Sequence, residues 1–282
     1  MSRGLPSMRP ALVLNAKTSS GLVALSLVTC LNTACAIKKW HATQIDDPKA
    51  DSFAALPHGS HIAILFRGQA FRQGGSHAAA CQESRVSDQL GMTQSVLDKI
   101  VLPLEQASHT VDIYLVESSN CTLLERIAGL LGGTRVRFQE SFKGTKQKDG
   151  VLKALQDFRS NTLHKPELYR VIIMMRFDLT FKSHIYEWPT VDFDAFNFFS
   201  RCEKGLSFRC VSDVMYVLPG EYFAAFQSMI GRGDCWSGSR PASGHHCFEQ
   251  AVAAFGFKHV RYVTDWRPNK IMREPSPELE IF

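Results

Sequence analysis

An arginine and an aspartate near the middle of the chain directly follow an apolar run. Residues 171–175 read VIIMM, and Arg176, Phe177 and Asp178 come next. Five consecutive apolar residues, three of them β-branched, predict a strand that is buried on both faces. Open α/β sheets bind their ligands beyond the carboxyl ends of such strands. Arg176 and Asp178 are therefore candidates for a ligand site, and an ordinary salt bridge at the end of a core strand is the alternative.

The two side chains suit different parts of phosphate chemistry. A carboxylate such as Asp178 can bind a divalent cation that also takes phosphate oxygens as ligands. The cation then neutralises the charge that develops on a departing nucleotide diphosphate. Arg176 would contact the phosphate oxygens directly, since a guanidinium group matches their geometry.

Two further arginines follow the first expected strand, residues 61–66. Gly68 permits a tight turn at the end of this strand. Arg67 and Arg72, on either side of the turn, are candidates for contacts with an anionic ligand. The spacing is not that of a G-x-G-x-x-G or P-loop phosphate site.

Two acidic residues in the second half of the chain are candidates for a general base, a group that takes a proton from a reacting hydroxyl. Asp213 lies at the start of an expected strand, residues 211–218, and Glu249 begins an expected helix, residues 248–255. Asp213 is alternatively a hydrogen-bonding residue at a strand end. Glu249 is alternatively a favourable charge in the first turn of a helix.

A literal D-x-D motif, Asp192-Phe193-Asp194, is a weaker metal candidate than Asp178. It follows Pro189 and Thr190 rather than an apolar strand. A solvated acidic loop is the interpretation that this position favours.

The elements that must position these residues alternate between strands and helices through the first half of the chain. This alternation predicts βαβ units and a mostly parallel sheet. In the second half, the aromatic residues between positions 193 and 199 show neither helical nor strand spacing. The expected strands are residues 61–66, 111–116, 135–138, 171–175, 211–218 and 260–263, and the expected helices are residues 95–107, 123–131, 150–159, 221–230 and 248–255.

The formal net charge of +5 comes entirely from the beginning of the chain. Residues 1–45 contain five basic residues and no acidic one, which leaves 27 basic and 27 acidic residues in the remainder. A neutral body gives no support for nucleic-acid binding.

The same first 45 residues resemble a targeting segment. Residues 21–37 are apolar and uncharged, with basic residues on both sides. Three interpretations remain open: an uncleaved signal anchor, a cleaved signal peptide, or an organelle transit peptide.

Six cysteines lie beyond the targeting segment, and an even number suits disulfides in an oxidising compartment. Two pairs are close in sequence, and six unrelated buried thiols are the alternative. The close pairs are Cys202 with Cys210 and Cys235 with Cys247.

Three segments together resemble the nucleotide-sugar glycosyltransferases of the GT-A fold. They are residues 65–72 (LFRGQAFR), 169–178 (YRVIIMMRFD) and 212–219 (SDVMYVLP). The resemblance implies a single Rossmann-like α/β domain with a mostly parallel central sheet flanked by helices, whose first half binds the nucleotide and second half the acceptor. It adds Gln69 to the substrate-binding candidates and implies Mn²⁺ or Mg²⁺ at Asp178. The family usually has D-x-D where this chain has Arg176-Phe177-Asp178.

These observations predict a glycosyltransferase that moves a sugar from a nucleotide-diphosphate donor to a glycan or glycoprotein acceptor. It would be attached to the Golgi or ER membrane by its N-terminal segment, with the catalytic domain in the lumen; secretion or organelle targeting is the alternative. A catalytically silent protein of the same fold, binding a glycan or a partner, is the rival function. The expected organisation is a targeting segment (1–45), a short stem (46–60), the transferase-like domain (61–265) and a C-terminal tail (266–282).

Overall fold

The computed structural model describes residues 53–71, 80–144, 147–188, 191–199, 213–232 and 256–261, together with Val252, residues 279–281 and the strands at 26–29 and 36–39. The chain divides into two compact units, Met1–Gln44 and Ile45–Phe282. In the first unit, β1 (Ser26–Thr29) and β2 (Ala36–Lys39) form an antiparallel pair. No helix in the described part of the chain is both long and apolar enough to cross a membrane.

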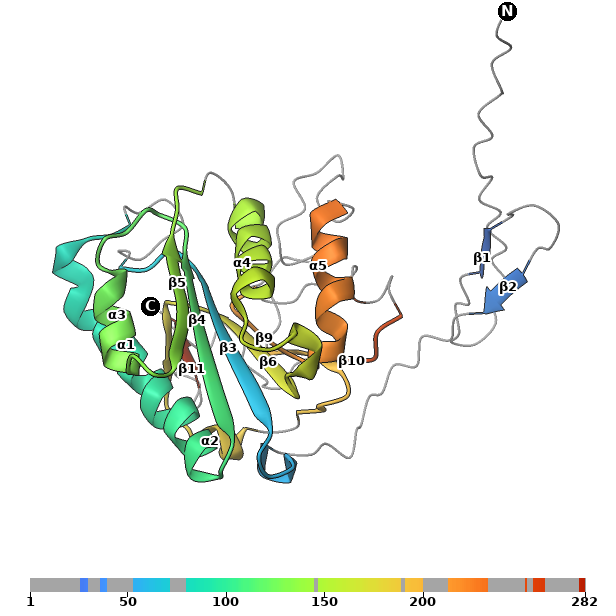
Figure 1. The fold of residues 1–282 in the computed structure, drawn as a ribbon, viewed down its shortest axis with the longest axis horizontal. Coiled ribbons are helices and arrows are strands. Elements are labelled where there is room, and N and C mark those ends of the chain that lie inside the picture. Colours follow the sequence, from blue (N-terminus) through green and yellow to red (C-terminus); the bar gives the residue numbers. More distant parts are fainter. Residues whose placement is uncertain are drawn as a thin grey trace, which may run out of the picture. The chain divides into compact units, whose positions relative to one another are not determined.

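The second unit is an α/β structure around a seven-stranded mixed sheet in the order β10-β8-β9-β6-β3-β4-β5 (Figure 1). Within this described sheet, β9 runs antiparallel to its two neighbours, β6 and β8, and all the other pairings are parallel. The strands are β3 (His61–Gly68), β4 (Thr110–Glu117), β5 (Val136–Ser141), β6 (Val171–Arg176), β8 (Phe196–Phe198), β9 (Met215–Leu218) and β10 (His259–Arg261). The predicted α/β class with a mostly parallel sheet is confirmed.

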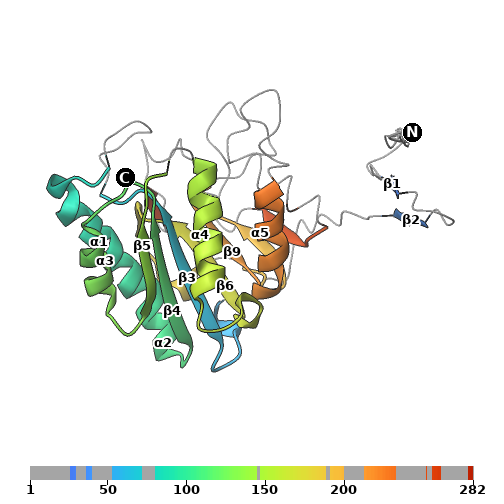
Figure 2. The ribbon, with the colours of Figure 1, turned by 45° about the horizontal axis from the view of Figure 1, so that its top comes forward.

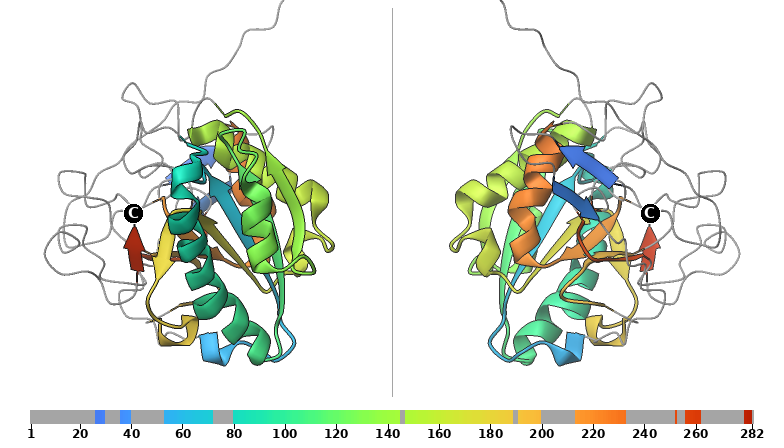
Figure 3. Two further views of the ribbon diagram at one scale, coloured as in Figure 1. Left: turned by 90° about the vertical axis from the view of Figure 1, so that its left-hand side faces the viewer. Right: turned by 90° about the vertical axis from the view of Figure 1, so that its right-hand side faces the viewer.

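Helices cover both faces of this sheet, and each face has its own apolar core (Figure 2). The first core joins alternate residues of the central strands to α1 (Val86–Val96), α2 (Leu102–Gln106) and α3 (Leu124–Leu131). The second joins the intervening residues to α4 (Gln147–Asn161) and α5 (Phe223–Arg232). Figure 3 shows α1 beside α3 in one view and α5 in the opposite view.

The strand order places a topological switch point between β3 and β6. From β3 the chain moves outward through β4 to β5 by way of α1, α2 and α3, then crosses back by way of α4 to form β6 on the other side of β3. The first three helices therefore lie on one face and α4 on the other. In open α/β sheets, the carboxyl ends of the strands at such a point border a crevice that binds ligands.

Burial explains why β3 and β6 form the centre of the sheet. Residues 62–67 and 171–175 are buried without interruption, as expected for strands covered on both faces. The two strands pair in parallel over Ile62–Arg67 and Val171–Arg176, and this register brings Arg67 directly beside Arg176. The strand that was predicted from the apolar run at 171–175 is thereby confirmed.

The helical segment around residues 95–107 is longer than predicted. It begins at Val86 and continues through a π-helical turn, Leu97–Val101, directly into α2. Pro103 lies in the first turn of α2, where its missing N–H costs little, so the chain stays helical through it.

One expectation was wrong: the aromatic region at 193–199 contains a strand, β8. Phe196, Asn197 and Phe198 are all buried, so the short strand lacks the alternation of polar and apolar residues that sequence reasoning looks for. The Asn197 side chain is buried because it hydrogen-bonds to neighbouring backbone, which no periodicity reveals.

Shorter elements complete the second unit. The turn that begins at Gly220 packs closely against the backbone of Pro166 and Tyr169. A Cβ atom at position 220 would lie 2.2 Å from the Tyr169 carbonyl oxygen and 2.4 Å from that of Pro166, which explains the glycine. The strand β11 (Leu279–Ile281) pairs antiparallel with β7 (Leu179–Phe181) in a separate two-stranded sheet. The 3₁₀ turns are Phe53–Ala55, Glu83–Arg85, Pro166–Leu168, Ile185–Glu187 and Gly220–Tyr222.

Candidate functional site

Charged and aromatic side chains gather at the carboxyl ends of β3 and β6, at the topological switch point. Arg67 is the seventh residue of β3, and Arg176 is the last residue of β6. Alternation along the strands puts both on the sheet face that α4 and α5 cover, together with Tyr216 of β9. We call Arg67, Arg176, Asp178, Asp213 and Tyr216 the carboxyl-end cluster.

Arg176 and Asp178 form a two-pronged ion pair. The Arg176 Nε donates to Asp178 Oδ1 at 2.8 Å, and Nη2 donates to Asp178 Oδ2. The Nη1 atom of Arg176 lies 3.7 Å from Asp213 Oδ1, so a second carboxylate faces the same guanidinium. The side chain of Asp178 is 5% exposed and that of Arg176 is 22% exposed, which leaves the arginine as the member with access to solvent.

The two carboxylates keep the arginine charged despite its burial. Burial by itself would lower the pKa of Arg176, but the negative charges of Asp178 and Asp213 outweigh it and raise that pKa. The guanidinium therefore provides a permanent positive charge at the end of β6.

Arg67 lies deeper in the cluster. It is 3% exposed, its Nη2 donates to the backbone carbonyl of Asp213, and its guanidinium carbon lies 5.8 Å from the centre of the Tyr216 ring. Its Nε atom is buried and has no hydrogen-bond acceptor among the described residues. A buried N–H group without an acceptor destabilises the folded state, so a ligand that accepts from this atom would gain a hydrogen bond.

Tyr216 belongs to the core of the α4 and α5 face and lies beside Arg67. Burial raises the pKa of its hydroxyl well above the ordinary value, and the positive charge of Arg67 only partly opposes this effect. The ring therefore stays neutral and offers its face to the guanidinium of Arg67.

A buried carboxylate, Glu117, holds the loops at this edge of the sheet. It is the last residue of β4 and accepts backbone N–H bonds from Ser119 at 2.8 Å, Cys121 at 3.0 Å and Ala70 at 3.3 Å. It therefore joins the loop after β3 to the loop after β4. A disulfide between Cys81 and Cys121 ties the same two loops covalently.

Gln89 of α1 provides a second brace under the cluster. Its side-chain oxygen accepts from the N–H of Phe71 at 3.0 Å, and its side-chain nitrogen donates to the carbonyl of Phe177 at 2.8 Å. The amide thereby links the loop after β3 to the peptide between Arg176 and Asp178. Gly68 supplies the turn that sequence analysis expected there, with a φ of 101°.

The predicted site residues fall into three groups. Arg67, Arg176, Asp178 and Asp213 come together in the carboxyl-end cluster. Gln69 is half-buried in the loop after β3, close in sequence to Arg67. Arg72 and Glu249 lie outside the described residues, as do the cysteine pairs 202/210 and 235/247.

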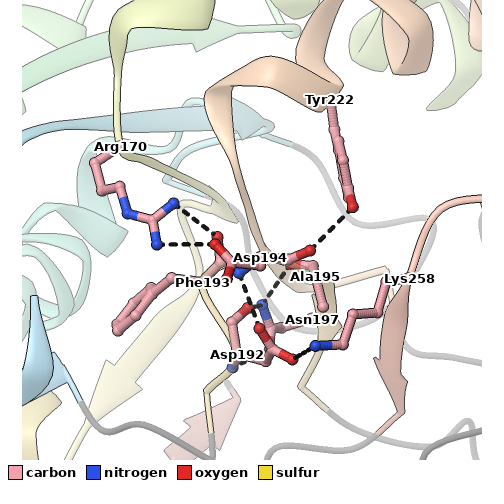
Figure 4. A network of polar contacts seen from close by, with 8 residues as sticks. All are labelled: Arg170, Asp192, Phe193, Asp194, Ala195, Asn197, Tyr222 and Lys258. Carbon is pink, nitrogen blue, oxygen red and sulfur yellow. Dashed lines mark hydrogen bonds and ion pairs between the residues drawn. The ribbon is translucent and has the colours of Figure 1, made fainter.

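The literal D-x-D motif lies at the other end of β6 (Figure 4). We call this group the amino-end network, because Arg170, which immediately precedes β6, donates from Nη2 to Asp194 Oδ1 at 2.9 Å. Asp192 Oδ2 is paired with Lys258 at 2.5 Å, and Asp192 Oδ1 accepts the N–H of Asp194 at 2.9 Å. The network consists of Arg170, Asp192, Asp194, Asn197, Tyr222 and Lys258.

Asn197 is the buried centre of the amino-end network. Its side-chain oxygen accepts from the N–H of Asp192, and its side-chain nitrogen lies within hydrogen-bonding distance of the carbonyls of Asp192, Ala195 and Val217. Because both aspartates are tied into this turn, the motif fixes the loop before β8. Asp194 is exposed, as a solvated acidic loop would have it, whereas Asp192 is largely buried, and the motif lies at the opposite end of β6 from the carboxyl-end cluster.

The arrangement at Asp178 does not fit the divalent cation that the resemblance implies. Both carboxylate oxygens accept hydrogen bonds from Arg176, so a cation bound to them would lie beside a guanidinium of like charge. The described residues contain no group of three or more His, Cys, Asp or Glu side chains placed to hold a metal ion. Asp192 and Asp194 lie at the other end of β6, so they are not further ligands for a cation at Asp178.

Sequence reasoning missed Glu117, Gln89 and Tyr216. Glu117 had a detectable signal, because it ends an apolar strand in the same way that Arg176 does. Gln89 had none, since its two partners come from separate loops. No protein-family model matches the chain, and no curated protein matches it either.

Proposed function

We propose that the protein is a glycosyltransferase that takes a sugar from a nucleotide-diphosphate donor. The observation that carries the proposal is the pairing of Arg67 with Arg176 at the carboxyl ends of the two strands that flank the switch point. Ligands of open α/β sheets bind in this position, and neighbouring guanidinium groups suit a diphosphate. The α/β fold with a mostly parallel sheet agrees with the finer proposal of a GT-A domain.

The transfer reaction needs a positive charge near the departing diphosphate. In the transfer, the bond from the sugar's anomeric carbon to the diphosphate oxygen breaks, and a bond to the acceptor oxygen forms. Arg67 and Arg176 stabilise the negative charge that the diphosphate gains. For an inverting reaction, Asp213 or Glu249 accepts the proton of the acceptor hydroxyl.

We extend the proposal to the secretory pathway, with the domain in the lumen of the Golgi or ER and the first 45 residues as its membrane anchor. The Cys81–Cys121 disulfide supports an oxidising compartment, in which such bonds persist. The acceptor would then be a glycan or a glycoprotein.

Nucleotide binding by the full chain tests the function. Thermal unfolding is followed with UDP, GDP, ADP and CMP and with their sugar conjugates, in the presence and absence of Mn²⁺. A ligand at 100 times its Kd adds about 2.7 kcal/mol to the free energy of unfolding, which is roughly 5–10 °C in the melting temperature of a domain of this size. Asp194→Ala, at the other end of β6, is the matched control and retains the shift. A folded protein that responds to no nucleotide refutes the proposal.

A catalytically silent binding protein with the same fold is the second candidate. The observation in its favour is that Arg176 engages both oxygens of Asp178, the acid at the expected metal position. The assay that separates the two is release of free sugar or its transfer to an acceptor. Turnover that disappears in Arg176→Gln excludes the silent alternative, whereas nucleotide binding without turnover favours it.

A further inference from the structure

We propose that this site binds its diphosphate ligand through the arginine pair without a divalent cation, and that Asp178 is a positioning residue for Arg176. The inference rests on the proposed function and specifies how its donor is held. It reassigns the one acid that the sequence offered as a metal ligand.

Arg176 has N–H groups that Asp178 does not engage. A guanidinium has five N–H groups, and Arg176 directs Nε and Nη2 to the two oxygens of Asp178. Its Nη1 atom lies 3.7 Å from Asp213 Oδ1, which is beyond hydrogen-bond length. The pairing with Asp178 therefore fixes the plane of the guanidinium and engages none of the Nη1 N–H groups.

The second step concerns Arg67. It is almost completely buried, yet its Nε has no acceptor among the described residues. Its Nη2 is held by the backbone carbonyl of Asp213, and the Tyr216 ring lies against its face. Both contacts restrict the side chain, so the unspent donor is already oriented when a ligand arrives.

The third step joins the two side chains. Because Arg67 and Arg176 are register partners on adjacent parallel strands, their backbones lie about 4.8 Å apart. Successive phosphates of a diphosphate share one bridging oxygen, so side chains that start from neighbouring strands can each take one phosphate. Each contact would be a charge-assisted hydrogen bond, the strong kind.

A metal site at Asp178 would need the opposite arrangement. Hard divalent cations take oxygen ligands and are repelled by a neighbouring guanidinium. Arg176 donates to both oxygens of Asp178, and Arg67 adds a second positive charge next to it. The two arginines therefore supply N–H donors for phosphate oxygens at the position where the resemblance implies a cation.

The first experiment measures binding of UDP, GDP and inorganic pyrophosphate to the full chain by calorimetry, once in EDTA and once with Mn²⁺. The proposal predicts a Kd in EDTA within about threefold of that in Mn²⁺. Arg67→Gln and Arg176→Gln each weaken binding in EDTA by about 10- to 100-fold, the size of a lost charged hydrogen bond. Arg170→Gln, at the other end of β6, is the matched control and binds normally.

The second experiment separates a positioning role for Asp178 from a metal-ligand role. Asp178→Asn weakens nucleotide binding in EDTA in the wild-type background but adds nothing to Arg176→Gln, because the aspartate acts through the arginine. Arg176→Lys with Asp178 intact keeps the charge and recovers only part of the affinity, since lysine lacks the planar fork. Near-UV circular dichroism confirms that each variant is folded, and Arg67→Gln tests the pair independently should Asp178→Asn fail to fold.

The outcomes distinguish this inference from the function beneath it. Nucleotide binding that requires Mn²⁺ and is abolished by Asp178→Asn overturns the inference and leaves the glycosyltransferase proposal standing. Binding in EDTA that depends on both arginines supports the two together. A folded chain that binds no nucleotide or pyrophosphate under either condition overturns both.

Discussion

The two ends of β6 carry similar residue types that serve opposite purposes. At its carboxyl end, Arg176 and Asp178 pair in a largely buried setting, and the buried Nε of Arg67 has no acceptor among the described residues. Before its amino end, Arg170 and Asp194 pair in the open, with side chains 38% and 72% exposed. The D-x-D sequence, which matches a metal motif by letter, is at the end where the polar groups are committed to a turn.

The two ends differ in the charge that they bury and in whether their buried polar groups have hydrogen-bond partners. In the amino-end network, the buried polar group is the neutral amide of Asn197, and its hydrogen bonds all serve the backbone. In the carboxyl-end cluster, the buried groups are charged. Concentrated charge at a switch point is expensive to bury, and this cost is one reason for the ligand that we propose there.

The largest expected effect comes from breaking the buried ion pair. Asp178→Ala leaves Arg176 without its partner and is expected to lower the free energy of unfolding by about 3 kcal/mol. Urea denaturation measures this loss. The double variant Arg176→Met with Asp178→Leu is the control, and it should cost clearly less because it removes both charges of this pair together. A loss below about 1 kcal/mol for the single variant would show that the pair is not effectively buried.

A somewhat smaller effect is expected at the centre of the amino-end network. Asn197→Ala leaves the N–H of Asp192 and the carbonyl of Val217 without their side-chain partner, which should cost about 2 kcal/mol. Asn161→Ala is the matched control, because that amide makes one bond, to the carbonyl of Asp157, at a helix end. Equal losses in the two variants, measured in urea, would contradict the assigned role of Asn197.

The exposed pair sharpens the comparison from the other side. Asp194→Ala removes an ion pair of the same residue types as Arg176–Asp178, but solvent screens it, so we expect a loss of no more than about 1 kcal/mol. Adding 0.5 M NaCl should reduce the difference between this variant and the wild type. A loss as large as that of Asp178→Ala would mean that exposure does not separate the two ends.

The smallest expected effect is a pH dependence at the amino end of the sheet. His109 immediately precedes β4. Burial is the main cause that lowers the pKa of His109 below its ordinary value of 6.5, and the charge of the nearby His58 is the second cause. The unfolded chain therefore binds a proton more readily than the folded one. The contribution of His109 to the free energy of unfolding is therefore complete above pH 6.5 and is lost as the pH drops below that value. His109→Gln should make urea stability less dependent on pH between 7.5 and 5, and an unchanged dependence would assign the effect to other groups.

Local patterns were enough to predict the central strands and the alternation that makes the sheet parallel. The uninterrupted apolar run at 171–175 can be buried only with both faces covered, so its place in the middle of the sheet followed from composition. The polar residues directly after such strands, Arg67, Arg176 and Asp178, were found for the same reason. β8 was missed, because a buried asparagine between two phenylalanines has no periodic signal.

What the sequence by itself determined is which residues end the buried strands, because the hydrophobic pattern depends on near neighbours. The tertiary structure decided which of those ends meet. The register of β3 on β6 brings Arg67 beside Arg176, and strand order separates Asp192 and Asp194 from both. It also decided that Arg176 binds Asp178, which turned an expected metal ligand into a partner of an arginine. Pairing across a sheet depends on packing between segments far apart in the chain, and no local spacing records it.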